Sequence, residues 1–178
     1  MRYIIITDTH INHKKLCENG LRPDDFEYKI IVNCLSELFD DDILIHLGDV
    51  SLGDDKSAHE TLMSLSNCKK WLLLGNHDHR SDSWYIEHGW DFVGKTMSIK
   101  RFGYRILFSH DPQPNLSEFD INIHGHFHNT DHKTKDPTYN SILCNKHFLI
   151  FLEHEYKPLT LKSIIRKWEK GYSRWNGS

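Results

Sequence analysis

Five aliphatic runs in this chain each end at, or just before, a short patch of small and polar residues. The patches are Asp8-Thr9-His10, Gly48-Asp49, Gly75-Asn76-His77-Asp78, Ser109-His110 and Gly125-His126-Phe127-His128. Short aliphatic runs are typical of buried strands. Because functional side chains gather on loops that a rigid scaffold positions, we expect all five patches to meet at one edge of a sheet. The predicted fold is therefore built around strands whose ends share a site.

The first half of the chain alternates between strand and helix patterns. Strands are expected at Tyr3 to Thr7, Ile43 to Leu47 and Trp71 to Leu74. Apolar residues recur at helical spacing from Asp24 to Phe39, and a second helix is expected over roughly Lys56 to Ser66. This alternation predicts parallel strands with helices on the faces of their sheet.

The second half is expected to be richer in strands, at Thr96 to Lys100, Arg105 to Ser109, Asp120 to His124 and Phe148 to Leu152. A hairpin turn is expected at Phe102-Gly103-Tyr104. This second sheet is therefore predicted to be mixed or antiparallel. Pro158 precedes a segment of about residues 159–175 whose apolar and basic residues predict a basic amphipathic helix.

Composition narrows the class of protein. The 178 residues are about the length of one domain, and we expect a single domain over residues 1–178. Without a long apolar segment or a signal pattern, the chain is expected to be cytoplasmic, with no membrane partner. The net charge of −3 leaves nucleic acid as a possible but not a favoured partner. The four scattered cysteines are expected to be free thiols, mostly buried.

The patches contain the residue types that hold divalent metal ions. Asp8 and His10 lie two apart at a strand end, so their side chains can point to the same side. Gly48 permits a tight turn that would bring Asp49 close enough to bridge two cations. The remaining expected ligands are Asn76, His110, His126 and His128. This mixture of carboxylate, imidazole and amide suits manganese, iron or zinc better than calcium, and its lack of thiolate disfavours a structural zinc site. Two divalent ions are expected, manganese first, with iron, zinc or nickel as alternatives.

In this order, the patches resemble those of the calcineurin-like metallophosphoesterase superfamily. Asn19-Gly20-Leu21-Arg22-Pro23 and Tyr156-Lys157-Pro158-Leu159-Thr160-Leu161 also resemble its small single-domain bacterial and phage members. The resemblance implies a four-layer α/β/β/α sandwich of two mixed sheets flanked by helices. It also implies one ion on Asp8, His10, Asp49 and His128, a second on Asp49, Asn76, His110 and His126, and His77 as the catalytic histidine.

The expected reaction is hydrolysis of a phosphoester by a hydroxide that bridges two ions. His77 would protonate the leaving oxygen, and Asp78 could orient its ring. Arg22, His13, Arg80 and Lys133 are candidates for substrate contacts, with solvated or packed side chains as the alternative reading. His46 is expected to be a hydrogen-bonded core residue.

The sequence also limits the substrate. Gly48-Asp49-Val50-Ser51-Leu52-Gly53-Asp54 lacks the Asp-Arg-Gly element of protein serine/threonine phosphatases, and the chain has no room for the DNA-binding cap of double-strand-break nucleases. A small phosphodiester or phosphomonoester, favourably of nucleotide type, is the main expectation. One alternative is a nuclease on single strands or ends that uses Lys162, Arg166, Lys167 or Arg174, and another is a scaffold without catalysis. The oligomeric state is left open.

Overall fold

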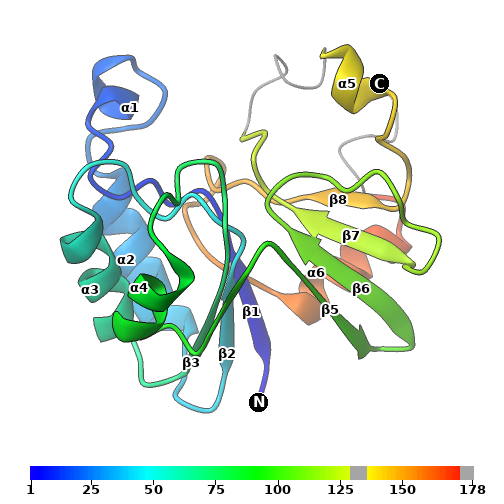
Figure 1. Ribbon diagram of the computed structural model, residues 1–178, viewed down its shortest axis with the longest axis horizontal. Coiled ribbons are helices and arrows are strands. Elements are labelled where there is room, and N and C mark those ends of the chain that lie inside the picture. Colours follow the sequence, from blue (N-terminus) through cyan, green and yellow to red (C-terminus); the bar gives the residue numbers. More distant parts are fainter. Residues whose placement is uncertain (129–135, 173–178) are drawn as a thin grey trace.

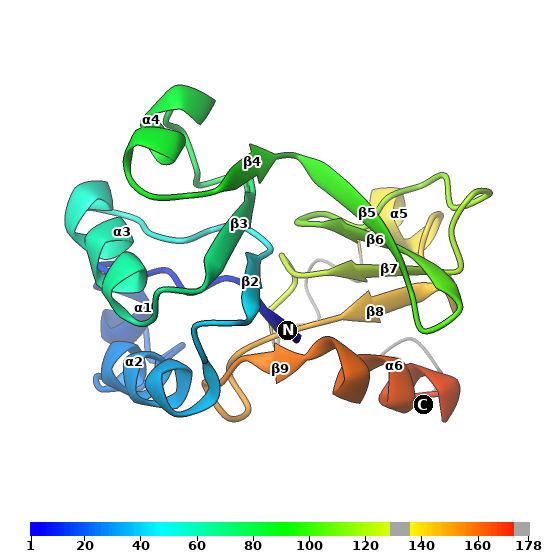
Figure 2. The ribbon, with the colours of Figure 1, turned by 90° about the horizontal axis from the view of Figure 1, so that it is seen from below.

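The strands of the protein form two mixed sheets that pack face to face, and helices flank them (Figures 1 and 2). The computed structural model describes residues 1–128 and 136–172. In the described part of the chain, no helix is long and apolar enough to cross a membrane. The two packed sheets with flanking helices confirm the fold class that the resemblance to metallophosphoesterases predicted.

The first sheet has five strands. From edge to edge they are β4 (Phe92–Gly94), β3 (Lys69–Leu73), β2 (Ile43–His46), β1 (Tyr3–Ile6) and β9 (Leu159–Thr160). β1 to β4 are parallel, as the alternation of strands and helices predicts, and β9 pairs antiparallel with β1. Helices α1 (Lys15–Glu18), α2 (Phe26–Glu37), α3 (Asp55–Ser64) and α4 (Asp82–Glu87) lie on its outer side (Figure 2).

The second sheet has four strands in the order β5 (Thr96–Arg101), β6 (Tyr104–Ser109), β7 (Ile121–His124) and β8 (His147–Leu149). β5 and β6 form the expected antiparallel hairpin, whereas β6, β7 and β8 are parallel. The two remaining helices are α5 (Pro137–Asn140) and α6 (Leu161–Glu169). The sheet is thus mixed, one of the two arrangements expected.

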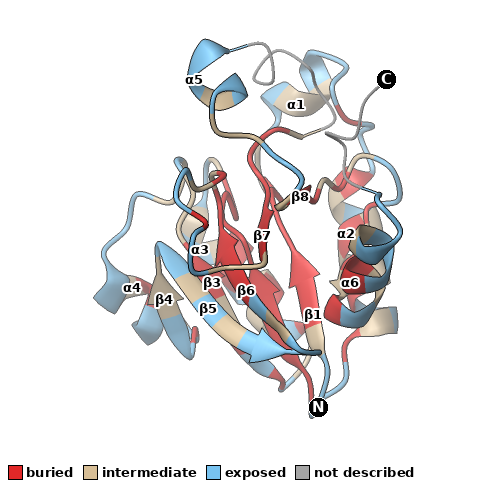
Figure 3. Ribbon diagram, turned by 90° about the vertical axis from the view of Figure 1, so that its right-hand side faces the viewer, coloured by how far each residue is buried: buried red, intermediate tan, exposed pale blue. Residues whose placement is uncertain are grey.

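The first sheet has a hydrophobic core on each face, one shared with its helices and one shared with the second sheet. The alternation of side chains along β1 contributes residues to both. Ile4 and Ile6 pack against the helices, whereas Ile5 points into the core between the two sheets. All three side chains are buried, and the central strands are buried along most of their length (Figure 3). On α6, Leu161 and Ile164 belong to the same inter-sheet core as Ile5. The site therefore rests on two well-packed sheets.

Several element boundaries differ from the expectations. The C-terminal helix begins at Leu161 rather than 159, because the Thr160 side chain accepts a hydrogen bond from the backbone N–H of Ser163 and caps the helix. It ends at Glu169, and residues 173–175 of the expected helix lie outside the described residues. The expected strand from Phe148 to Leu152 is the shorter β8. All four cysteines are free, but only Cys34 and Cys68 are buried.

Candidate metal centre

The polar patches follow the strands of both sheets and meet at one end of the sandwich, at the top of Figure 1. Backbone hydrogen bonds join their loops: Asp8 N donates to Gly48 O at 2.9 Å and His10 N donates to Asp49 O at 3.1 Å. On the second sheet, Gly125 N donates to His110 O at 3.1 Å. Before any side chain is considered, the loop after β1 is therefore joined to the loop after β2, and the loop after β6 to the loop after β7.

Backbone strain is concentrated in these loops. Among the described residues, eight that are not glycine have positive φ angles, and five of the eight are expected ligands. The five φ angles are 49° at Asp8, 48° at His10, 57° at Asp49, 71° at His126 and 49° at His128. Side chains with a Cβ rarely adopt this conformation, and such strain persists where the surrounding structure enforces it, often at functional sites.

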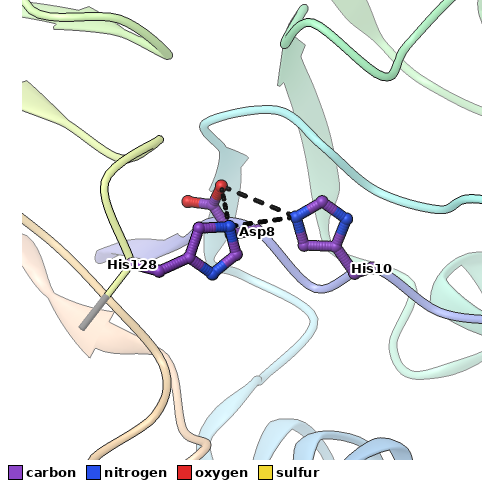
Figure 4. A group of neighbouring side chains, drawn as sticks. All are labelled: Asp8, His10 and His128. Carbon is purple, nitrogen blue, oxygen red and sulfur yellow. Dashed lines mark hydrogen bonds and ion pairs between the residues drawn. The ribbon is translucent and has the colours of Figure 1, made fainter. Parts of the chain in front are cut away.

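One group of expected ligands consists of Asp8, His10 and His128 (Figure 4). His128 Nε2 lies 3.4 Å from Asp8 Oδ1 and 3.2 Å from His10 Nε2. Asp8 Oδ2 accepts hydrogen bonds from the Thr7 hydroxyl at 2.6 Å and from His126 N at 3.0 Å, whereas buried Oδ1 has no donor among the described residues. That oxygen is available to a cation.

A second group consists of Asp49, His110 and His126. His110 Nε2 lies 2.9 Å from His126 Nδ1, 3.2 Å from Asn76 Oδ1 and 3.4 Å from Asp49 Oδ2. Asp49 Oδ2 is also 3.7 Å from His10 Nε2, so one carboxylate oxygen lies close to both groups. All seven residues expected as metal ligands are therefore brought together, with Asp49 in the central position.

The hydrogen bonds on the far sides of the rings decide which nitrogens face the centre. His110 Nδ1 lies 2.8 Å from Leu47 O, and His128 Nδ1 lies 2.7 Å from Glu153 Oε1. His126 Nε2 lies 3.2 Å from Asp111 Oδ1. Because a carbonyl or carboxylate oxygen can only accept, the rings of His110 and His128 carry a proton on that side when neutral and turn a lone pair inward. His126 Nε2 instead forms a hydrogen bond with the Tyr139 hydroxyl, which can donate or accept. Converging lone pairs and carboxylate oxygens fit a cation and repel one another without one.

The pKa values of the centre indicate the same need for positive charge. Burial lowers the pKa of His110, but its hydrogen bond to Asp49 and the charges of Asp8 and Asp49 outweigh burial and raise the pKa to about 9. Burial raises the pKa of Asp49, but the hydrogen bond and charge of His110 lower it well below its usual range. The carboxylates thus stabilise an added proton, and a metal cation in the same place would be stabilised for the same electrostatic reason.

The sequence profile of the calcineurin-like phosphoesterase family matches residues 1–175. The chain belongs to this family. Its members in general bind divalent metal ions and act on phosphoesters. No protein with a curated description matches the chain.

Solved structures are similar to this family member to different extents. A protein of unknown function from Aquifex aeolicus is 25% identical, with a TM-score of 0.72, over 93% of this chain and 98% of its own. A novel archaeal phosphodiesterase is 19% identical with a TM-score of 0.45, over 72% and 74%. The nuclease MPE of Pseudomonas putida is 21% identical with a TM-score of 0.48, over 71% and 62%.

His77 and Asp78 have separate surroundings in this phosphoesterase. The ring of His77 is partly exposed, with Nε2 4.0 Å from Asp49 Oδ2, and its backbone N donates to Asp49 Oδ1 at 2.8 Å. The Asp78 carboxylate accepts hydrogen bonds from the backbone N–H groups of Gly75, Asp49 and Val50. Asp78 therefore joins two loops, which differs from the expected role of orienting the His77 ring.

The four expected substrate contacts have different positions. Arg22 is buried and donates to the carbonyls of Asp8 and Thr9 and to Glu153, so its side chain is not free to bind a substrate as expected. Arg80 is exposed and pairs with Asp55 at 2.8 Å. The ring of His13 lies beside the centre, 5.4 Å from the ring of His10 and 6.3 Å from that of His77. Lys133 lies outside the described residues.

Three residues at the centre were not found from the sequence: Glu153, Asp111 and Tyr139. Glu153 contacts His128 and Arg22, while Asp111 and the Tyr139 hydroxyl, 3.4 Å from Nε2, contact the outer side of His126. Burial raises the pKa of Glu153, but its hydrogen bond to His128 and the charge of Arg22 outweigh burial and lower the pKa to about 2. Asp111 follows His110 directly, and Glu153 follows the expected strand from Phe148 to Leu152, so each had a local signal in the sequence.

The basic residues of α6 lie elsewhere. Arg166, Lys167 and Lys170 line a hollow of about 620 Å³ together with apolar residues of the segment from Phe148 to Leu152. None of the expected metal ligands lines this hollow. Lys162 is exposed on the same helix, and Arg174 lies outside the described residues. A nuclease that uses α6 would therefore contact its substrate away from the metal centre.

Proposed function

We propose that this chain is a hydrolase of small phosphodiesters or phosphomonoesters that works with two divalent ions, manganese being the first candidate. A nucleotide-type substrate is favoured. The observation that carries the proposal is the central position of Asp49, whose Oδ2 lies 3.7 Å from His10 Nε2 and 3.4 Å from His110 Nε2. Two neighbouring cations require a carboxylate that lies between two groups of metal-binding side chains and can contact both ions.

The residues divide between the two ions in a way that supports this proposal. Asp8, His10 and His128 would hold one ion, Asn76, His110 and His126 the other, and Asp49 both. Two such ions lower the pKa of coordinated water and neutralise charge on the phosphoryl oxygens. The chain's own residues supply the fixed positions: strained loops, backbone hydrogen bonds between them, and rings oriented from their outer sides.

His77 is the proton donor in this proposal. Its side chain is 32% exposed, compared with 2% for His110 and 3% for His10, so among these three rings it is the one that a bound substrate can reach. Its backbone N–H is fixed by Asp49 Oδ1. The ring can therefore donate to the leaving oxygen of an ester held beside Asp49.

The test is a hydrolysis assay of metal-stripped protein reloaded with Mn²⁺. We expect release of p-nitrophenol from bis(p-nitrophenyl) phosphate or p-nitrophenyl phosphate, and a loss of about 10²- to 10⁴-fold in His77→Ala. His154→Ala is the matched control, because the His154 side chain is 81% exposed and is not part of the centre. Unchanged turnover in His77→Ala would reject its role, and no hydrolysis of any phosphoester by Mn²⁺-loaded protein would reject the proposed function.

A panel of natural substrate classes then separates the alternatives. Nucleotides, cyclic nucleotides and dinucleotides test the favoured class, and single-stranded oligonucleotides test the nuclease alternative. Salt-sensitive cleavage of oligonucleotides that is lost in Arg166→Ala or Lys167→Ala would favour the nuclease. Binding of metal without cleavage of any member of the panel would favour the scaffold.

A further inference from the structure

A buried ion pair lies directly behind one of the two expected ion positions. The side chains of Arg22 and Glu153 are 1% and 12% exposed, and Arg22 Nη2 lies 2.7 Å from Glu153 Oε1. The same oxygen lies 2.7 Å from Nδ1 of His128. Residues 22, 128 and 153 are far apart in sequence, so the contact is made only by the fold. A buried charge pair costs desolvation energy and is weak evidence of a stabilising role, which raises the question of what this pair does.

Arg22 also holds the loop that carries the other two ligands of this position. Its Nη1 donates to the carbonyl of Thr9 at 3.0 Å and its Nη2 donates to the carbonyl of Asp8 at 2.8 Å. Both carbonyls belong to a loop in which Asp8 and His10 have positive φ angles. One guanidinium group therefore fixes the strained backbone of Asp8 and His10 and, through Glu153, the ring of His128.

We propose that Arg22 and Glu153 are a positioning pair that turns the Nε2 lone pair of His128 toward Asp8 and His10 and thereby sets the affinity of this one ion position. The inference rests on the proposed function for the ligand, a divalent cation. Neither residue is proposed to touch the substrate. The relevant group is drawn in Figure 4, where Nε2 of His128 faces Asp8 and His10.

The geometry selects one tautomer of His128 over the other. With its proton on Nδ1, the ring donates to Glu153 at 2.7 Å and presents a lone pair to the centre. With its proton on Nε2, the ring would turn that N–H toward Asp8 Oδ1 at 3.4 Å, outside hydrogen-bond geometry, and Nδ1 would accept from Arg22 at 3.3 Å. The first arrangement has the shorter, charge-assisted hydrogen bond and leaves Asp8 Oδ1 and His128 Nε2 open to a cation. Removing the charge of Glu153 removes this preference.

The other ion position has a support of its own. Asp111 Oδ1 lies 3.2 Å from His126 Nε2, and its side chain is 45% exposed. Glu153 contacts His128 and not His126 in the hydrogen bonds described, so the two carboxylates act on different rings. We therefore expect substitutions at Glu153 and Asp111 to weaken different ions.

The experiment is a calorimetric titration of metal-stripped protein with Mn²⁺ at pH 7.5. We expect two binding events in the parent protein, and in Glu153→Gln one event weakened by about 10- to 100-fold with the other retained. Asp111→Asn should weaken one event by a similar factor, and the double variant should weaken both. Glu155→Gln is the matched control, since Glu155 lies on the same segment but is exposed and pairs with Lys157 at 2.7 Å.

A second measurement addresses the ring directly and needs no metal. Nitrogen-15 spectra of the metal-free parent protein, with His128 assigned by its loss in His128→Gln, should show the proton on Nδ1. In Glu153→Gln the signal should shift toward the Nε2-protonated form. This measurement on the parent protein also decides the proposal if Glu153→Gln does not fold.

The outcomes separate this proposal from the proposed function. Two unchanged Mn²⁺ affinities in folded Glu153→Gln, a double variant that weakens only one event, or a proton on Nε2 in the parent would overturn the positioning role. Hydrolytic activity of the parent could still stand in each of these cases. A parent protein that binds no Mn²⁺ would instead remove the proposed function, and with it the affinity role of the pair, even if the spectra show the expected tautomer.

Discussion

Asp78 illustrates how a single carboxylate can hold the loops of the centre together. Its Oδ2 accepts from Gly75 N and Asp49 N, both at 2.8 Å, and its Oδ1 accepts from Val50 N at 3.1 Å. Three backbone N–H groups therefore depend on one side chain. The loop after β3 and the loop after β2 are joined in this way, and Asn76 Oδ1 in the first of them lies 3.2 Å from His110 Nε2.

We predict that Asp78→Asn lowers the free energy of unfolding by about 1–3 kcal/mol, because the amide group must present an NH₂ to at least one of these N–H groups. Chemical denaturation followed by circular dichroism measures the change. Asp82→Asn, at an exposed position on α4, is the control and should stay within about 0.5 kcal/mol of the parent. A stability of Asp78→Asn equal to that of the control would show that water replaces the carboxylate.

At the same scale, the sequence indicated which expected ligands would lie together better than it indicated the residues that support them. Asp8, His10 and Asn76 could be proposed because each lies at or after a strand end beside other donors. Arg22 was expected at the substrate because a cation near a metal centre attracts anions, and the sequence does not show that its side chain is buried. Glu153 follows the expected strand from Phe148 to Leu152 but belongs to none of the five patches, and only the tertiary fold places it against His128.

In the hairpin between β5 and β6, the residue type at position 102 is poorly suited to the backbone conformation of the turn. Phe102 has a φ angle of 55° and Gly103 one of 86°, so both central residues are in the left-handed region that a tight hairpin turn requires. Glycine adopts this conformation readily, whereas phenylalanine does not. Phe102 is 47% exposed, and the guanidinium carbon of Arg101 lies 5.5 Å from the centre of the Phe102 ring.

We predict that Phe102→Asn raises the free energy of unfolding by about 0.5–1 kcal/mol, because asparagine tolerates positive φ and Asn-Gly favours this turn. The midpoint of thermal unfolding should rise by about 2–4 °C per kcal/mol. Gly103→Ala should lower the free energy of unfolding by about 1 kcal/mol, because alanine is strained at this positive φ angle. The added Cβ would meet no atom within 4 Å, so the φ angle alone causes the loss. A less stable Phe102→Asn would mean that the Arg101 contact outweighs backbone strain.

Element boundaries show where periodicity stops being informative. The hairpin itself could be predicted because Phe102-Gly103-Tyr104 separates two runs of strand-forming residues. β4 has three residues and β9 two, which is too short for an alternating pattern to be recognised. β9 also lies next to β1 although the two are far apart in sequence, and this pairing makes the first sheet mixed. Local sequence carries no information on such a pairing.

For the whole molecule, the centre depends on the two sheets packing together, because its expected ligands come from loops of both. The same packing buries histidines that are not expected ligands. His46 bonds to the Thr9 hydroxyl at 2.9 Å, as expected for a hydrogen-bonded core residue, and burial lowers its pKa to about 3. Burial lowers the pKa of His59 to about 4. At neutral pH each of these rings is uncharged in the folded protein, and it binds a proton more readily in the unfolded chain.

The sign of the resulting pH dependence follows from these pKa values. His59 has a folded pKa of about 4, below its unfolded value of 6.5. Between these values the unfolded chain binds more protons, so the free energy of unfolding falls as the pH falls from about 6.5 to about 4. The contribution is fully present above pH 6.5, and its loss is at most about 3 kcal/mol, at about 1.4 kcal/mol per pH unit. Acid should therefore destabilise the protein even when metal is absent.

His59→Asn isolates one such histidine. Trp90 Nε1 donates to His59 Nδ1 at 2.8 Å, so the ring must accept at this atom, and the asparagine oxygen can accept there without titrating. We predict that urea denaturation of the metal-free protein at pH 7, 6, 5 and 4 shows a smaller loss of stability in His59→Asn than in the parent. His154→Asn, at an 81% exposed histidine, should keep the parent slope. Parallel curves for His59→Asn and the parent would mean that His59 accepts a proton in the folded protein as readily as in the unfolded chain.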